Sequence, residues 1–286
     1  MIADNEFVGL PKSFWAFVRL IGQQCGYTVR LKSEILIPSR KLVEEKMKLV
    51  GISATGLDSL LQDGVTTTWE KLDAYFKHRS YLLHSHVEPN LMDKEAAKEL
   101  FSQSKKRLNP KCVIPMNKQK GKKKTPAYLT GIVNMLIEAS AKGSKCDYDP
   151  RSLITIERNS IPLRTFSRRM DGAFPSVRNP IAVWEIKEYY YTTTFGSRVA
   201  DGVYETLLDG MEIEELEAAE RVRVLHYLII DAHYTWWKCG KSYLCRIVDM
   251  LHMGYVDEVI VGREVVARIP ELVADWVKIE EIRSKQ

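Results

Sequence analysis

The second half of the chain alternates between apolar runs of strand length and segments with helical periodicity. IAVWEIKEYY (181–190) and VRVLHYLIIDAH (222–233) are apolar enough to form buried strands, and the segment 197–220 between them has the pattern of a helix. Strands that alternate with helices are typical of a sheet covered by helices. We therefore expect an α/β domain over residues 126–286.

The first hundred residues are predicted to be mostly helical. FWAFVRLIGQQ (14–24), RKLVEEKMKLVG (40–51) and TTTWEKLDAYFKHRSYLLHSH (66–86) carry apolar residues at helical spacing. Ser13, Ser39 and a threonine precede these segments and are expected to cap them. Several short helices in succession are compatible with a helix-turn-helix, and simple packing explains them as well. Residues 1–104 are thus expected to form a helical N-terminal region that contacts DNA.

A basic block separates the two halves of the chain. It contains no acidic residue between Ser104 and Thr125, and its basic residues are Lys105, Lys106, Arg107, Lys111, Lys118, Lys120, Lys122, Lys123 and Lys124. Such a block creates a positive potential that attracts phosphate groups, although a solvated linker would have the same composition. We interpret residues 105–125 as a basic loop or linker.

Composition excludes several classes of protein. The net charge of +5 is too small to identify a partner, and the five cysteines are scattered without a CxxC pair. No apolar run approaches the roughly 20 residues that cross a bilayer, and the N-terminus lacks the pattern of a signal peptide. These features predict a cytoplasmic protein with reduced thiols and no membrane association.

Two charged residues interrupt the apolar run that begins at Ile181. In an extended strand, Glu185 and Lys187 point to the same side, because side chains alternate between the two faces. Burying a carboxylate and an amine is costly unless they pair or bind an ion. An ordinary salt bridge at the end of a strand would satisfy this requirement. A site at the strand end would satisfy it too.

Asp171, in RRMDGAF (168–174), favours a site at the strand end over an ordinary salt bridge. This segment is predicted to be the preceding strand, so Asp171 and Glu185 can converge on one divalent cation. Mg²⁺ suits two carboxylates because it keeps several waters. Bound beside a phosphate, it polarises the phosphoryl oxygen and lowers the pKa of the attacking water. Lys187 would then stabilise the negative charge that develops in the reaction.

The pattern Asp171…Glu185-x-Lys187, on two strands followed by a helix, resembles the PD-(D/E)xK nuclease superfamily. This superfamily includes many type II restriction endonucleases, and the similarity covers roughly residues 126–265. The stretch WEIKEYYYTTTFGSRVADGVYE (184–205) is similar to a restriction-type subgroup. Met170 stands where the superfamily name has proline. The resemblance implies a mixed central β-sheet flanked by helices, a restriction-endonuclease-like core, and Mg²⁺ as the cofactor.

The resemblance also implies further site residues. A glutamate on the helix before the core strands often joins the metal site, and Glu138 occupies a comparable place, with Glu157 as a substitute. The residues expected to contact the DNA backbone are Arg168, Arg169, Arg198, Lys122, Lys123 and Lys124. Strand alternation predicts that Arg169 points with Asp171 and Arg168 away from it. Asp231 and His233, which end a long apolar strand, are secondary candidates, and a satisfied polar cluster explains them as well.

These features predict a magnesium-dependent deoxyribonuclease that cuts double-stranded DNA at a specific site, a type II restriction enzyme. Because two strands must be cut at a palindromic target, a homodimer is expected. Two alternatives stay open. One is a nuclease effector of another phage-defence system, and the other is a catalytically silent DNA-binding protein that keeps the nuclease fold.

Overall fold

A computed structural model of the chain describes residues 1–29, 34–119, 122–191 and 196–285. The side chains of residues 118, 119, 122–124 and 198 also fall outside the described part. In the described residues, no helix combines the length and the apolar character needed to cross a membrane.

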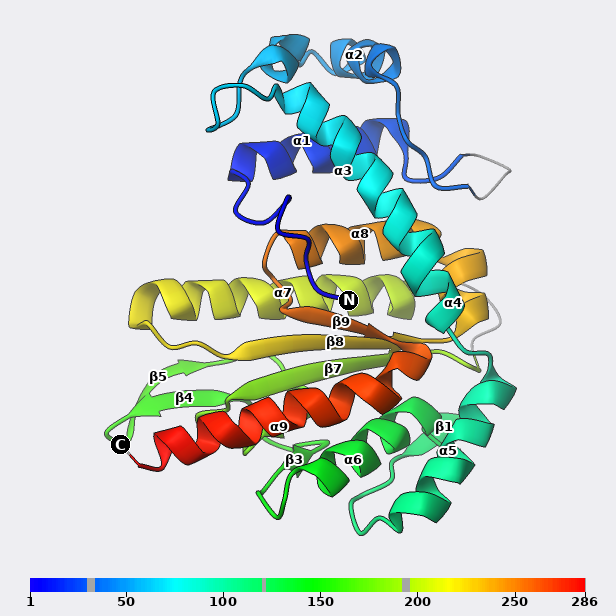
Figure 1. Cartoon of the computed structure of the whole chain (residues 1–286), viewed down its shortest axis with the longest axis vertical. Coiled ribbons are helices and arrows are strands. Elements are labelled where there is room, and N and C mark those ends of the chain that lie inside the picture. The colour runs from blue at the N-terminus through cyan, green and yellow to red at the C-terminus, as the bar shows by residue number, and fades with distance from the viewer. Residues whose placement is uncertain (30–33, 120–121, 192–195, 286) are drawn as a thin grey trace.

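A five-stranded mixed sheet forms the centre of the C-terminal part (Figure 1). Its strands, in spatial order, are β3 (Asp147–Tyr148), β6 (Gly172–Phe174), β7 (Ala182–Glu188), β8 (Leu225–Asp231) and β9 (Glu258–Val261). The pairs β3–β6 and β6–β7 are antiparallel, whereas β7–β8 and β8–β9 are parallel. The predicted α/β fold with a mixed sheet is therefore confirmed.

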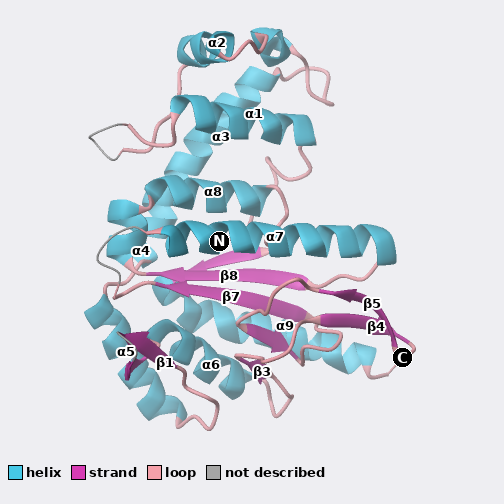
Figure 2. Ribbon diagram, turned by 180° about the vertical axis from the view of Figure 1, so that it is seen from behind, coloured by secondary structure: helices cyan, strands magenta, loops and turns pink. Residues whose placement is uncertain are grey.

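Helices cover both faces of this sheet (Figures 1 and 2). On one face lie α7 (Ser197–Glu220) and α8 (Lys241–His252), and on the other lie α6 (Tyr128–Ser140) and α9 (Val265–Arg283). The two parallel strand pairs require such helical crossovers, since a parallel neighbour cannot be reached by a tight turn. The helix predicted for residues 197–220 is confirmed.

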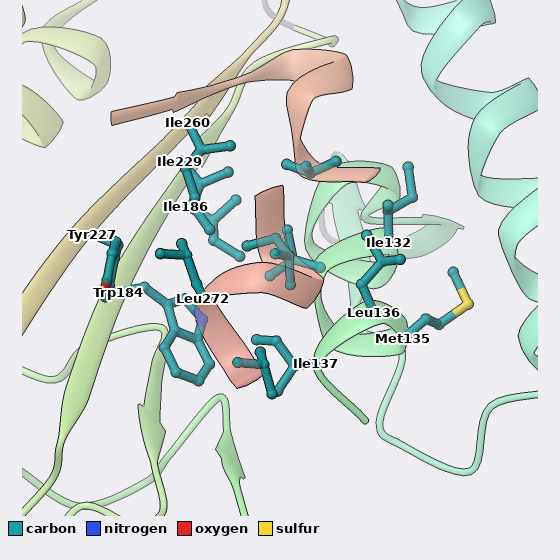
Figure 3. Close-up of a cluster of buried hydrophobic side chains, with 14 of the residues drawn as sticks. Ile132, Met135, Leu136, Ile137, Trp184, Ile186, Tyr227, Ile229, Ile260 and Leu272 are labelled. Carbon is teal, nitrogen blue, oxygen red and sulfur yellow. The ribbon is translucent and has the colours of Figure 1, made fainter. Parts of the chain in front are cut away.

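The two faces of β7 have different characters. Trp184 and Ile186 face α6 and α9, and the ring of Trp184 stacks on that of Trp276 with centroids 5.6 Å apart. Figure 3 shows Trp184, Ile186 and Ile229 directed toward these two helices. Val183 lies on the opposite face, in a cluster with residues of α7. Alternation along β7 therefore sends Glu185 and Lys187 toward α7.

The N-terminal part packs around its own aromatic core. It comprises α1 (Lys12–Cys25), α2 (Arg40–Leu49), the 3-10 turn η1 (Ala54–Asp58) and α3 (Thr68–Leu82). Phe14, Trp15, Tyr75 and Phe76 form the centre of this core. The predicted helical character of this region is confirmed.

The predicted helix caps are confirmed in two of three cases. Thr67 caps α3 in a capping box with Glu70, and the Ser39 side chain accepts a hydrogen bond from the backbone N–H of Leu42. The prediction for Ser13 is wrong. α1 begins at Lys12, directly after Pro11, so Ser13 lies inside its first turn. Proline presets a backbone angle that suits the residue before a helix.

The basic block is more ordered than the predicted loop. After the π-helical turn η2 (Leu83–Val87) and α4 (Glu88–Asn90), α5 (Lys94–Leu108) extends into the block. β1 (Met116–Gln119) and β2 (Lys122–Pro126) then form an antiparallel pair. Lysine and arginine are good helix formers, and in the last turn they interact favourably with the helix dipole. This explains why α5 continues to Leu108.

The segment around residues 155–165 lies outside the central sheet. β4 (Thr155–Arg158) and β5 (Ile161–Thr165) form a separate hairpin. The remaining short elements are η3 (Tyr234–Cys239) and η4 (Gly262–Glu264), which follow β8 and β9.

A substitution at Gly172 tests how tightly β6 packs beside β7. A Cβ atom there would lie 2.1 Å from ring atoms of Trp184, which the stack on Trp276 holds in place. We expect Gly172→Ala to lower the free energy of unfolding by about 1–3 kcal/mol, the usual cost of overpacking. Chemical denaturation measures this value. Gly196→Ala, where no atom lies within 4 Å of the added Cβ, should cost less than about 1 kcal/mol, and an equal loss in both variants would contradict the packing argument.

Candidate functional site

Asp171 lies just before β6, beside the part of β7 that carries Glu185. Its backbone N–H donates a hydrogen bond of 3.1 Å to the carbonyl of Trp184. The negative charge of Glu185 reaches Asp171 and adds to the effect of burial on its pKa. The Asp171 Oδ2 atom also accepts a hydrogen bond of 2.7 Å from the backbone N–H of Ile186. The structure thus brings together the two carboxylates that the sequence analysis selected.

Glu185 has no exposed surface and lies between two cations. Lys187 Nζ donates to its Oε2 atom over 2.7 Å, and Arg168 Nη2 donates to the same atom over 3.1 Å. Burial alone would raise the pKa of Glu185, but the positive charges of Lys187 and Arg168 outweigh it and lower that pKa. Glu185 is therefore held as a carboxylate.

Burial has the opposite net effect on Asp171. Desolvation and the negative charge of Glu185 raise the pKa of Asp171 to about 7, although Lys187 and the hydrogen bond from Ile186 oppose the shift. For Lys187, desolvation lowers the pKa, but the charges of Glu185 and Asp171 outweigh it and raise the pKa above its usual range. The site therefore contains one ionised carboxylate, one acid that titrates near neutrality, and a protonated amine.

Helix α7 adds two acidic residues that complete this cluster. Lys187 Nζ donates to Glu205 Oε2 over 3.1 Å, and Arg168 Nη1 donates to Asp209 Oδ2 over 2.6 Å. Asp209 is fully buried, and burial raises its pKa to about 7. Asp209 was not predicted to be a site residue. Its spacing of four residues from Glu205, which puts both on one face of the helix, was the available signal.

The predicted orientation of the two arginines is wrong. Arg168 joins the cluster, whereas Arg169 is exposed. Residues 167 and 168 form a bend instead of a strand, so side-chain alternation does not apply to them. Both arginines line a polar pocket of 480 Å³ that extends to Asp171. In the described part of the chain, no carboxylate pairs with Arg169.

The structure does not bring Glu138 to this cluster. Glu138 lies on α6, which packs on the opposite face of the sheet, and its Oε2 atom accepts a hydrogen bond of 2.9 Å from the backbone N–H of Lys111. Glu157 lies on β4 and pairs with Arg178 at 2.8 Å. The side chains of Arg198 and residues 122–124 lie outside the described part, so their predicted DNA contacts are not placed.

Asp231 belongs to a different buried cluster, at the carboxyl ends of β7 and β8. Its Oδ1 atom accepts hydrogen bonds from the backbone N–H groups of Met92 and Ala232, over 2.7 and 2.8 Å, and Tyr190 donates its hydroxyl to Oδ2. Glu188 is paired with Asp231 in the strand register and accepts a hydrogen bond of 2.6 Å from the backbone N–H of Leu129. These carboxyl groups connect the sheet to the starts of α5 and α6.

The Asp171–Glu185 cluster offers carboxylate oxygens, which are the ligands that hard divalent cations prefer. Across the described residues, no set of three or more His, Cys, Asp or Glu side chains is arranged around a metal position. Two buried oxygens in the cluster, Glu185 Oε1 and Asp209 Oδ1, nevertheless have no hydrogen bond. The first lies 3.0 Å from Arg168 Nη1 without hydrogen-bond geometry. An all-oxygen donor set with spare acceptors fits Mg²⁺, so Asp171 and Glu185 could hold this ion.

A comparison with family models divides the chain into two regions. Residues 92–276 match the model of a domain of unknown function (DUF7687). The chain belongs to the DUF7687 family. Residues 1–86 match the model of another domain of unknown function (DUF7690). No curated protein and no solved structure matches the chain. The DUF7687 region therefore contains α5, the β1–β2 pair, the central sheet and the Asp171–Glu185 cluster.

Asp231 makes the stability of the DUF7687 region depend on pH. Burial raises the pKa of Asp231 to about 7, from an ordinary value of about 3.9. Between these values the folded state keeps a proton that the unfolded state has lost, so the free energy of unfolding falls as the pH rises through this window. Asp231→Asn keeps the Oδ1 acceptor but cannot titrate.

We expect the stability of the wild type to fall more steeply than that of Asp231→Asn between pH 5 and pH 7. The difference between their slopes should be on the order of 1 kcal/mol per pH unit. Urea titrations at several pH values measure both slopes. Parallel curves for the two proteins would contradict the raised pKa.

Proposed function

We propose that the chain is a magnesium-dependent DNA endonuclease, most simply a type II restriction enzyme. The observation that supports this proposal is the convergence of Asp171, Glu185 and Lys187 at one place beside β6 and β7. This is the residue set of the PD-(D/E)xK pattern, and it lies in a mixed sheet flanked by helices, as the resemblance to restriction endonucleases requires.

In this proposal Asp171 and Glu185 hold the metal ion. When bound, Mg²⁺ supplies a Lewis acid and lowers the pKa of a water molecule that attacks the phosphorus atom. Lys187 is held within 2.7 Å of Glu185, so its protonated amine lies beside the metal ligands and stabilises the charge that develops on the phosphate. Glu205, which also contacts Lys187, orients that amine.

Arg168 competes with a metal ion for the same carboxylate. Its guanidinium group contacts Glu185, Glu205 and Asp209, where it neutralises part of their charge. Arg168 also lines the pocket that extends to Asp171, so its side chain has space to turn into this pocket. A divalent cation held by Glu185 would leave the guanidinium of Arg168 available to bind a phosphate of the DNA backbone.

Exposed basic residues provide the second part of the proposal. Arg169 lines the same pocket as Asp171, and in the described part of the chain it has no acidic partner. Lys105, Lys106 and Arg107 form the basic last turn of α5. Such side chains bind DNA through its phosphates and release counterions. A homodimer would supply one cluster for each strand of a duplex.

Cleavage of plasmid DNA tests the catalytic assignment. We expect magnesium-dependent cutting by the wild type, and a loss of at least about 100-fold for Asp171→Asn and Lys187→Ala. The first substitution weakens the metal site, and the second removes the positive charge that stabilises the reacting phosphate. Excess EDTA should stop the reaction. Asp275→Asn, at an exposed position of α9 that pairs with Lys278, is the matched control and should cut normally.

The pattern of products separates the possible functions. Discrete bands support a restriction enzyme, and a smear supports a nuclease effector without sequence specificity. A shifted but uncut plasmid supports a silent DNA-binding protein. Full activity in both Asp171→Asn and Lys187→Ala, with circular dichroism spectra like that of the wild type, would remove the site assignment.

Arg169 tests the proposed contact with the DNA backbone. We expect Arg169→Gln to weaken DNA binding equally for different sequences and to reduce the slope of log affinity against log salt concentration by about one. Fluorescence anisotropy with Ca²⁺ in place of Mg²⁺ measures binding without cutting. Lys278→Gln on α9 is the control. An unchanged salt slope for Arg169→Gln would place this residue outside the DNA path.

A further inference from the structure

A cavity of 260 Å³ lies on the far side of α7 from the Asp171–Glu185 cluster. It is formed where the N-terminal helices meet the helices that cover the sheet, and Figures 1 and 2 show α8 stacked between α1 and α7. α1 contributes Arg19, α7 contributes Tyr204 and Leu207, and α8 contributes Arg246 and Met250. Its lining is therefore mainly apolar and aromatic, with two arginines.

Three tyrosines hold Arg246 in a fixed orientation. Its guanidinium carbon lies 5.1 Å from the ring centroid of Tyr27 and 4.6 Å from that of Tyr243, and its Nη1 atom donates a hydrogen bond of 2.9 Å to the hydroxyl of Tyr204. These partners are neutral. In the described residues no carboxylate pairs with Arg246, so its charge is positioned by aromatic rings but not neutralised.

Arg19 carries a second positive charge into the cavity. Its Nη2 atom donates to Met253 Sδ at 3.6 Å, and a thioether is only a weak acceptor. Within the described ranges, Arg19 has no acidic partner either. Two guanidinium groups that line one cavity repel one another unless an anion lies between them.

Asp249 also lines the cavity, but its charge is already balanced. It accepts hydrogen bonds of 2.9 and 3.2 Å from Arg79 Nη1 and one of 2.6 Å from the hydroxyl of Tyr75. Arg79 is fully buried behind it and makes no contact with another carboxylate in the described part. The cavity therefore keeps the excess positive charge of Arg19 and Arg246.

We propose that this cavity binds a small organic anion that carries a flat ring, of about the size of a nucleoside monophosphate. The anionic group would accept hydrogen bonds from Arg19 and Arg246, which offer planar sets of donors for phosphate or carboxylate oxygens. The ring would pack against Leu207, Met250 and the half-exposed ring of Tyr204. The volume is close to the lower end of the roughly 300–1,000 Å³ of ligand pockets. This binding does not require the nuclease activity.

Isothermal titration calorimetry in EDTA tests the proposal, because EDTA keeps divalent ions out of the catalytic cluster. Two probes distinguish the sources of such an anion: adenosine monophosphate represents nucleotides, and 2-naphthoate represents aromatic carboxylates. We expect at least one to bind with a dissociation constant below about 1 mM. Adenosine, which lacks the anion, and inorganic phosphate, which lacks the ring, should bind at least about tenfold more weakly.

Two substitutions locate the binding. Arg19→Gln and Arg246→Gln should each weaken the binding of the tighter probe about tenfold, since each removes a charge-assisted hydrogen bond. Arg19 lies on an exposed face of α1, so its replacement leaves the packing intact and decides the test even if Arg246→Gln does not fold. Lys48→Gln, on the exposed face of α2, is the control. Absence of binding by both probes, or unchanged affinity in folded Arg19→Gln, would overturn the proposal.

Discussion

The complete burial of the Glu185 carboxylate is the constraint on which the arrangement of the site depends. A charged group without exposed surface is stable only beside opposite charges, and here Lys187 and Arg168 supply them. Glu205 and Asp209 in turn contact these cations, so α7 is fixed to the sheet by charge as well as by apolar packing. The cluster contains more carboxyl groups than cations. Burial, together with the negative charge of Glu185, raises the pKa values of Asp171 and Asp209. A divalent cation would balance the excess of negative charge.

The sequence predicted what depends on regular periodicity and missed what depends on tertiary contacts. The strand at Glu185 and Lys187 was predictable because alternation fixes which side chains share a face. Arg168 was misplaced because a bend interrupts the alternation just before β6. Asp209 shares a helix face with Glu205, but its importance depends on which turn of α7 lies over β7, and this cannot be read from the sequence. The N-terminal helices were predictable from apolar spacing, and Thr67 from its capping box with Glu70.

The position of Glu138 follows from the same alternation. Trp184 and Ile186 point away from Glu185, and the helix that packs on them is α6. A side chain on α6 therefore lies on the other side of the sheet from Glu185. The glutamate that does reach α6 is Glu188, which shares the face of Trp184 and accepts a hydrogen bond at the start of this helix. The two acids of β7 thus have different roles: Glu185, directed toward α7, belongs to the charged cluster, and Glu188 anchors α6.

Helix α7 connects the charged cluster with the arginine-lined cavity. One side of this 24-residue helix carries Glu205 and Asp209, and the other carries Tyr204 and Leu207. Because both sides belong to one helix, a shift of α7 that widened or narrowed the cavity would also change the contacts of Lys187 and Arg168 on the opposite side. A ligand changes such an equilibrium only by its different affinity for the two positions of the helix. If both sites bind as proposed, occupation of the cavity and binding of a metal ion at Glu185 would be coupled to the extent that each favours a particular position of α7.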